Sequence, residues 1–506
     1  MSAEGGYLHS ELVPWRRLDR RMLLVHPVSE VVRFLPLLLG LFFLGRGSAE
    51  DPGHYVGVVI PIAIGLLRFI STSFRITGTQ IELRRGVLSR SVLTAPLDRV
   101  RTVELTATPI HRALGLSRVV IGTGSASRSG EGRLTLDSLR TPEAHRIRAT
   151  LLHSPADGQP HDGIAPGVPV ARGAAAGENV IMRLDPTWVR FAPLTTSGLV
   201  IAFAAFAASL QFLGGLLATR ISTSDVEHRV ATLPLAVLIP AGVVSFLVAI
   251  SLLAIGGYVL TNWGFLLTRD DVARTLHIRR GLLTTRETSI EIGRLRGVEI
   301  HEPLGLRLAN GGRLNAIVTG FKRSAEGSTP IVPPAPRAVV AAVGEAVLAE
   351  RGPLDVALRA HGPAARRRRY VRAVATTSVL PTVGLILAAT GTWPWWPGLV
   401  ALVLPLAGVL LARDRYRRLG HALTPEYVVI RWGSLRGRRD ALQRTGIIGW
   451  NIRQTFFQRR AGLVSLTATT AAGQQSYEIL DLPEQWATDF ADAAVPGLVA
   501  QFLDLA

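Results

Sequence analysis

Arginine is the residue of this sequence whose type and spacing could support a specific function. The formal net charge is +19 at pH 7, and arginine carries nearly all of the positive charge. Guanidinium groups bind phosphate and carboxylate oxygens through paired hydrogen bonds. Ten arginines recur on predicted strands and turns of a repeated stretch: Arg84, Arg85, Arg99, Arg101, Arg279, Arg280, Arg294, Arg296, Arg431 and Arg444. We expect this set to bind anionic lipid headgroups or an acidic protein segment, although solvated arginines on the cytoplasmic side would give the same pattern.

Acid–base and thiol chemistry find less support. Asp98 and Glu104 lie in one copy of the repeat and Glu299 and Glu302 in another, without a common spacing. A general acid–base pair needs both carboxylates beside one reacting atom. The sequence contains no cysteine, so disulfides and thiolate catalysis are excluded. We therefore predict a protein that is not an enzyme and has no catalytic residues, cofactor or metal.

The repeated stretch covers residues 83–124 and organises the rest of the chain. Ile278–Leu283 matches Leu83–Leu88, and Ile292–Glu299 matches Leu97–Glu104 at the same distance from the preceding glycine. A third copy is looser and places Ala441–Arg444 where the first copy has residues 96–99. Self-similarity at this period indicates one supersecondary unit used three times.

Apolar segments between the copies predict six membrane spans. Hydrophobic residues make up 48% of the chain and charged residues only 18%, below the ~25% of soluble domains. The runs 28–44 and 55–74, 191–217 and 233–260, and 371–389 and 396–411 are read as three helical hairpins, because about 20 apolar residues cross a bilayer as a helix. The flanks of the hairpins on one side are rich in arginine, so the positive-inside rule places both termini and all three copies in the cytoplasm.

Each copy after a hairpin is predicted to be strands followed by one helix. Short β-rich runs end at Gly86, Gly281 and Gly433, and a helix with proline near its start closes each copy. Residues 154–185 are rich in Gly, Ala, Pro and Asp and are predicted to be a flexible linker.

The predicted order is a basic tail (1–25), hairpin 1 (26–73), domain 1 (74–153), the flexible linker (154–185), hairpin 2 (186–263), domain 2 (264–350), a basic linker (351–370), hairpin 3 (371–412) and domain 3 (413–506).

With these features, the chain resembles bacterial pleckstrin-homology-like membrane proteins of the YdbT type. The residues that carry the resemblance are Arg85–Leu88, Leu97–Glu104 and Pro109–Leu116, with counterparts in the other two copies. The resemblance implies a membrane protein of α+β class with three tandem units. Each unit would be a two-helix transmembrane hairpin followed by a PH-like antiparallel β-sandwich or split barrel with a C-terminal helix. The resemblance implies no catalytic residue.

These observations predict a six-span protein of the bacterial inner membrane that presents three cytoplasmic PH-like domains as a lipid-surface or protein-binding scaffold. The expected partners are anionic membrane lipids and other membrane or cytoplasmic proteins. Nucleic acid is not expected, because aromatic residues are not interleaved with the arginines. A passive transporter or lipid-handling protein that uses the six-helix region is the alternative. An ion-coupled carrier is disfavoured, because the span interiors hold hydroxyl and amide side chains and not charges.

Overall fold

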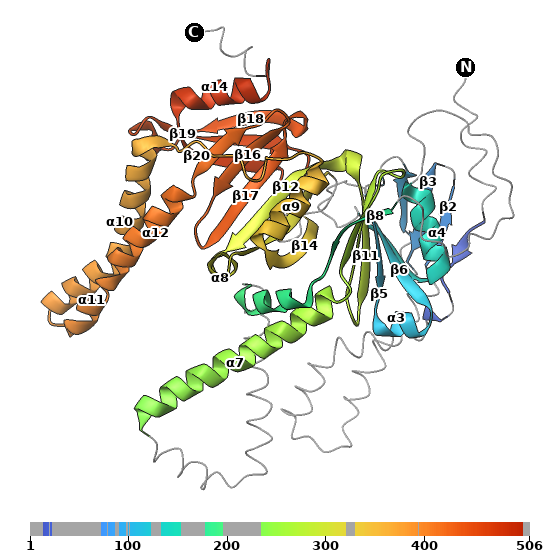
Figure 1. Cartoon of the computed structure of the whole chain (residues 1–506), viewed down its shortest axis with the longest axis horizontal. Coiled ribbons are helices and arrows are strands. Elements are labelled where there is room, and N and C mark those ends of the chain that lie inside the picture. The colour runs from blue at the N-terminus through green and yellow to red at the C-terminus, as the bar shows by residue number, and fades with distance from the viewer. Residues whose placement is uncertain are drawn as a thin grey trace. The chain divides into compact units, whose positions relative to one another are not determined.

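The computed structural model describes residues 14–19, 21–22, 72–77, 79–86, 91–97, 100, 102–122, 133–152, 178–195, 234–319, 329–392 and 394–498. The described residues form two compact units, one made of Met1–Arg183, Leu260–Arg294 and Gly320–Lys322 and the other of the remaining segments (Figure 1).

The first unit holds two antiparallel sheets. One sheet has the order β1-β2-β3-β4 and the other the order β7-β6-β5-β11-β10-β9-β8. The strands are β1 (Arg16–Arg17), β2 (Ser73–Ile76), β3 (Gln80–Arg85), β4 (Ser91–Pro96), β5 (Thr102–Ala107), β6 (Leu116–Gly122), β7 (Arg133–Arg140), β8 (Glu178–Arg183), β9 (Leu266–Asp270), β10 (Thr275–Arg280) and β11 (Thr285–Glu291). Helix α3 (Pro109–Ala113) joins β5 to β6, and α4 (Thr141–Leu152) follows β7.

The core of this unit lies between its two sheets. Phe74, Ile81 and Leu83 come from the four-stranded sheet, and Val103 and Ile121 come from the other, all at 1% exposure or less. Alternate residues of these strands point inward, which gives each sheet one apolar face. Helix α4 closes the core with its apolar side.

The second unit has a six-stranded sheet of order β14-β13-β12-β17-β16-β15 and a three-stranded sheet of order β18-β19-β20. The strands are β12 (Leu295–Pro303), β13 (Gly311–Val318), β14 (Thr329–Pro336), β15 (Gly420–Leu423), β16 (Tyr427–Trp432), β17 (Arg436–Gln443), β18 (Ile447–Arg453), β19 (Leu463–Thr470) and β20 (Ser476–Pro483). The shorter helical segments are η2 (Pro186–Leu194), α8 (Leu304–Leu308), α9 (Arg337–Leu348), α13 (Phe456–Arg459) and α14 (Glu484–Ala494). A core of Val428, Ile430, Leu466 and Ile479 joins the two sheets, and α14 packs against it.

The same succession of strands and helices occurs three times, and we call these the first series (β2 to α4), the second series (β9 to α9) and the third series (β15 to α14). Each series begins with three strands, has a short helix after its fourth strand and ends in a longer helix after its sixth. The predicted closing helices are confirmed at α4, α9 and α14, each of which has proline at or next to its start.

The glycine after the second strand of each series has a left-handed backbone. The φ angles of Gly86, Gly281 and Gly433 are +106°, +111° and +92°. A Cβ on Gly281 would lie 2.0 Å from the carbonyl oxygen of Thr284, and one on Gly433 would lie 2.1 Å from that of Arg436. The repeated glycine in the sequence is therefore a requirement of this turn.

The series are joined edge to edge by β-strands. In the first unit, β5 of the first series pairs antiparallel with β11 of the second; in the second unit, β12 of the second series pairs antiparallel with β17 of the third. We call these pairings joint 1 and joint 2. A sandwich or split barrel was predicted for each copy, and the structure adds that sheets run from one series into the next.

Three described helices are long and apolar enough to cross a membrane: Val243–Asn262 within α7 (Leu235–Asn262), α10 (Gly362–Ala389) and Trp396–Arg417, which comprises α11 (Trp396–Val400) and α12 (Val403–Arg417). These three match three of the six predicted spans. Residues 23–71 and 196–233 hold the other three predicted spans, apart from the ends of two of them, and lie outside the described residues.

Three predicted boundaries differ from the structure. The predicted flexible linker (154–185) ends in strand β8, which pairs with β9. The predicted basic linker (351–370) contains the first turns of α10, which begins at Gly362, because proline at the first turn and good helix formers after it favour a helix. The predicted span 191–217 begins in η2, where Trp188 and Phe191 are buried. At β8 and η2, pairing or packing with distant segments outweighs local composition.

Candidate lipid-facing arginines and the joints between series

The arginines predicted in the first series are only partly described. Arg84 on β3 is exposed, and its guanidinium carbon lies 5.1 Å from the centre of the Trp15 ring. Arg85 belongs to β3, but its side chain lies outside the description, as do Arg99 and Arg101 altogether. Arg84 is therefore the one arginine of this set whose side chain can be placed.

The arginines predicted in the second series are all near acidic or amide groups. Arg279 is exposed and its Nε lies 3.7 Å from Glu287. Arg280 is half-buried, and burial followed by repulsion from Arg286 lowers its pKa. Arg294 donates to Glu291 at 2.5 Å, and Arg296 donates to Gln443 at 3.1 Å.

The two arginines predicted in the third series bind the chain's own backbone. Arg431 donates to the carbonyl oxygens of Arg417 and Arg418, at the end of α12. Arg444 donates to the carbonyl oxygens of Ala493 and Ala494 at 2.9 and 2.6 Å, which caps the C-terminus of α14. Lipid binding by the ten arginines stays a prediction, but these two guanidinium groups already have structural roles.

Arg444 also shows that the sequence alignment of the third copy was wrong by two residues. The 3-10 turn η3 (Ile292–Arg294) precedes β12, and η4 (Arg444–Gly446) precedes β18. Arg444 therefore corresponds to Ile292 and to Leu97, which lie at the same distance from their turn glycine. The aligned Leu-x-Arg pattern is local and recurs by chance, whereas the strand pairing fixes the register.

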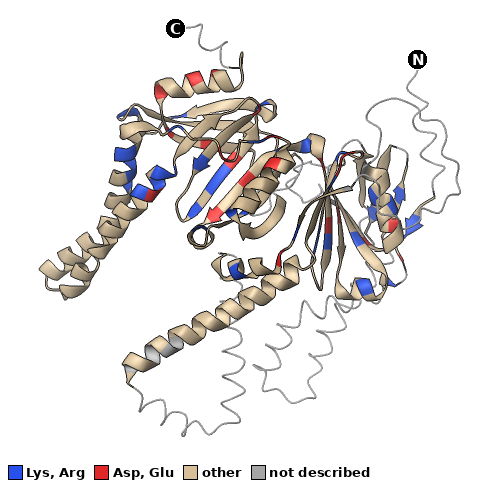
Figure 2. Cartoon of the chain, viewed as in Figure 1, with Lys and Arg blue, Asp and Glu red and all other residues tan. Residues whose placement is uncertain are grey.

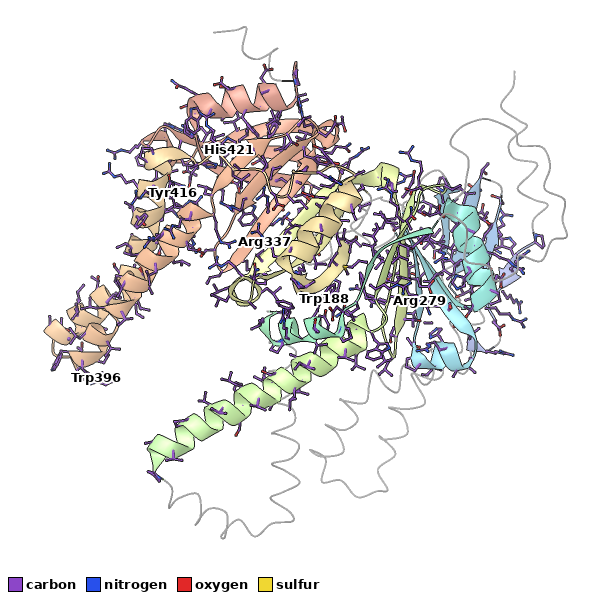
Figure 3. The ribbon with its side chains drawn as sticks, in the orientation of Figure 1. Trp188, Arg279, Arg337, Trp396, Tyr416 and His421 are labelled. Carbon is purple, nitrogen blue, oxygen red and sulfur yellow. The ribbon has the colours of Figure 1, made fainter. Side chains whose placement is uncertain are left out.

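A second basic group, outside the ten predicted arginines, lies at one end of α10 and α12. We call it the hairpin cluster, and its exposed members are Arg366, Arg367, Arg372, Arg413, Arg415 and Arg417. Figure 2 shows these basic residues gathered at the helix ends that lie next to the sheet. In Figure 3, Tyr416 marks this end of the helix pair, and Trp396 marks the opposite tip.

Two further arginines of α10 hold the hairpin cluster against β20. Arg368 and Arg369 form ion pairs with Asp481, which has no exposed surface, and Arg369 lies 2.7 Å from it. Gln458 also donates a hydrogen bond to the Asp481 carboxylate at 3.0 Å. A buried carboxylate needs such partners, so the base of α10 is fixed to the third series and its exposed arginines are presented together.

The joints carry a recurring glutamate–arginine pair. Glu104 lies 3.9 Å from Arg286 in joint 1, and Glu299 lies 2.6 Å from Arg438 in joint 2. The two pairs occupy the same positions in their series, measured from the turn glycine. Glu104 and Glu299, which the sequence comparison already aligned, are thus equivalent in the structure, and each binds an arginine of the next series.

Joint 2 extends this pair into a buried network. Arg438 also donates to Asp440 at 2.5 Å, and Tyr477 donates to Glu299 at 2.8 Å. Burial and repulsion from Glu299, only partly offset by Arg438, raise the pKa of Asp440 to about 6. Every carboxylate of this network faces a hydrogen-bond donor, so the network stabilises the pairing of β12 with β17. Among the described residues, no group of three His, Asp or Glu side chains could hold a metal ion.

Two parts of the chain match one known protein family. Residues 31–154 and 375–492 match the model of the family described as Bacterial PH domain. Over these residues the chain is similar to bacterial PH domains. The match covers the first and third series and supports a PH-domain-containing bacterial protein. No curated protein and no solved structure matches the chain.

Proposed function

We propose that this is a non-enzymatic integral membrane protein of the YdbT type, with three PH-like domains in tandem that form a scaffold at the cytoplasmic leaflet of a bacterial inner membrane. The hairpin cluster carries the proposal. Its six exposed arginines lie at one end of α10 and of the segment Trp396–Arg417 (α11 and α12), both of which are long and apolar enough to span a bilayer. Lipid phosphates lie at that depth, and each arginine near an anionic leaflet contributes about 1 kcal/mol.

The described spans support the scaffold over the passive transporter. Hydroxyl groups on α10 donate to carbonyl oxygens one turn earlier in the same helix: Thr376 to Arg372, Thr377 to Ala373 and Thr382 to Ser378. Such internal hydrogen bonds satisfy the hydroxyl groups without a polar neighbour. These three hydroxyl groups of α10 are therefore satisfied within their own helix and do not call for a polar substrate along it.

The test is lipid selectivity of the full-length protein in detergent. The apparent dissociation constants of short-chain phosphatidylglycerol and phosphatidylcholine are measured from the thermal stabilisation that each lipid gives. In the triple variant Arg367→Gln/Arg372→Gln/Arg415→Gln we expect phosphatidylglycerol binding to weaken about 100-fold, from the loss of three contributions of about 1 kcal/mol, with phosphatidylcholine unchanged.

A matched control removes the same charge elsewhere. Arg146, Arg351 and Arg460 are exposed and lie outside α10 and α12, so their triple replacement by glutamine changes net charge equally. Equal weakening in the two triple variants would show a general charge effect and would contradict a lipid site at the hairpin cluster.

A further inference from the structure

Joint 1 and joint 2 use the same strand register. Thr102 lies opposite Ile290 in joint 1, and Gly297 lies opposite Leu442 in joint 2. Both pairs occupy the same positions relative to the turn glycines of their own series. One pairing rule therefore connects the fourth strand of a series to the third strand of the next.

The joints also share a contact outside the strands. Arg112 of α3 donates to the carbonyl oxygen of Leu282 at 2.7 Å in joint 1, and Arg307 of α8 donates to that of Ser434 at 3.3 Å in joint 2. The two acceptors each follow the turn glycine of the next series. Arg459 of α13 holds the corresponding position in the third series; it is exposed, and no described residue accepts a hydrogen bond from its guanidinium.

Strand β18 is the joint strand of the third series, yet it pairs only with β19 among the described strands. Its Ile452 is 45% exposed, whereas Leu105 and Ile300, at the same position of β5 and β12, are 4% and 1% exposed. Exposed strand edges normally carry lysine, proline or inward-facing charge. Residues 447–453 contain one arginine but no lysine or proline. The composition of β18 therefore resembles that of a strand whose edge is covered by a neighbouring strand.

Strand β4 is the complementary case. It is the third strand of the first series and occupies the place of β11 and β17, and among the described strands it pairs only with β3. Its outer residues Ser91 and Thr94 are exposed, and Val92 is 51% exposed. Among the described strands, the outer edge of β4 has no strand partner, and the joints use the same edge of β11 and β17.

We propose that β18 of one copy of this protein pairs antiparallel with β4 of a second copy, in the register of joints 1 and 2. That register places Gly449 opposite Ala95, Ile452 opposite Val92 and Arg453 opposite Ser91. The exposed isoleucine and valine then meet in a cross-strand pair. The contact uses different surfaces on the two copies, so it repeats and produces head-to-tail chains or a closed ring.

Neither β18 nor β4 carries the charged residue that forms the ion pair of the joints. Asn451 and Ser91 stand where the joints have glutamate and arginine. Because both charges are replaced, pairing β18 with β4 buries no unpaired charge. A second copy therefore fits this edge better than β11 or β17 would, since their arginines, Arg286 and Arg438, would meet an asparagine.

The test uses cysteine pairs carried by different copies of the full-length protein, which has no native cysteine. A copy with Ile452→Cys and a differently tagged copy with Val92→Cys are expressed together and oxidised in membranes. The proposed register predicts a mixed disulfide, because directly opposite residues of a sheet have Cβ atoms about 4.5–5.5 Å apart. The control copy carries Thr94→Cys, a diagonal neighbour at about 7–8 Å, and we expect at least fivefold less product.

A second cysteine pair tests the same register independently of Ile452 and Val92. Arg453→Cys and Ser91→Cys, again on separate copies, are expected to crosslink, and adding Ile452→Lys to the first copy is expected to abolish the product by placing a charge at the edge. A chain that carries both Ile452→Cys and Val92→Cys is expected to give a ladder of dimers, trimers and larger species. The proposal is overturned by equal crosslinking of the Val92 and Thr94 partners, or by disulfides that form only within one chain.

Discussion

Left-handed backbone recurs at fixed turn positions of the three series. Gly86, Gly281 and Gly433 share the same turn, and Gly115, Asn310 and Gly462 share a second one, all with positive φ. The second series uses asparagine where the others use glycine, which is the side chain that best tolerates this conformation. Single residues therefore fix where each strand must reverse.

The turn glycines give the first prediction. Gly281→Ala places a methyl group 2.0 Å from the Thr284 carbonyl oxygen at a φ of +111°, and we expect a loss of about 3 kcal/mol. The melting temperature in detergent should fall by about 5–10 °C. Gly293→Ala is the control, because its Cβ would meet only a Glu291 side-chain atom at 3.6 Å. Similar melting temperatures for the two variants would contradict the requirement for glycine.

A buried histidine pair sits between the segment before α10 and β15. His361 and His421 are 1% and 3% exposed, and their facing ring nitrogens are 2.9 Å apart. The other nitrogen of His361, Nδ1, lies 2.8 Å from the Leu480 carbonyl oxygen, which can only accept. His361 Nδ1 therefore donates to Leu480, and its Nε2 accepts from His421, so the pair is satisfied when both rings are neutral.

This pair predicts acid sensitivity. Burial lowers the pKa of His361 to about 4 and that of His421 to about 3, so the unfolded chain binds protons first as the pH falls below about 6.5. Stability contributed by the neutral pair is complete above pH 6.5 and declines toward pH 4, by about 3 kcal/mol for His361 alone. Melting temperatures measured from pH 7.5 to 4 should decline less steeply in His361→Asn/His421→Gln. Parallel profiles for the variant and the native chain would rule out this pair as the source.

At the scale of elements, the two joints place the same ion pair in different surroundings. The side chains of Glu104 and Arg286 are 30% and 55% exposed, whereas those of Glu299 and Arg438 are 0% and 6% exposed. Exposed pairs contribute at most about 1 kcal/mol. Removal of one partner from a buried pair costs about 3–5 kcal/mol, because the other charge is left without compensation.

The joints therefore predict unequal effects of equivalent substitutions. Arg438→Met should destabilise the protein by about 3–5 kcal/mol, since Glu299 and Asp440 stay buried, and Arg286→Met by less than about 1 kcal/mol. Adding Glu299→Gln to Arg438→Met should restore part of the loss. Thermal unfolding of the four proteins tests this, and equal losses for the two arginine variants would show that the buried network is not the cause.

The local sequence pattern predicted individual turns and helices better than it predicted which strands pair with each other. Glycine turns, the closing helices and the apolar helices α7, α10 and α12 could be read from the sequence, because each depends on nearby residues. The pairing of β5 with β11 joins residues of about 180 positions' separation in the chain, and no local periodicity encodes such a contact. Arg444 was misaligned for the same reason: its place is set by β18 and α14, not by its neighbours in sequence.

For the whole molecule, charge and hydropathy together support the proposed orientation in the membrane. The hairpin cluster places six exposed arginines at one end of α10 and α12, and the turn between these helices at 390–397 contains no charged residue. Translocating the arginine-rich end would cost more than translocating the turn. The proposed topology therefore follows from an asymmetry within a single described hairpin.

Single-cysteine variants of this cysteine-free chain test the topology directly. Thr150, Val272 and Ser476 are exposed residues of the three series, and Thr392 is exposed in the turn between α10 and α11. A membrane-impermeant maleimide applied to intact spheroplasts should label Thr392→Cys and leave Thr150→Cys, Val272→Cys and Ser476→Cys unlabelled until the membrane is permeabilised, because arginine-rich flanks stay in the cytoplasm. Each variant labelled after permeabilisation serves as its own control for reactivity. Labelling of any of the three series residues in intact spheroplasts would place that series outside the cell and remove it from the cytoplasmic scaffold.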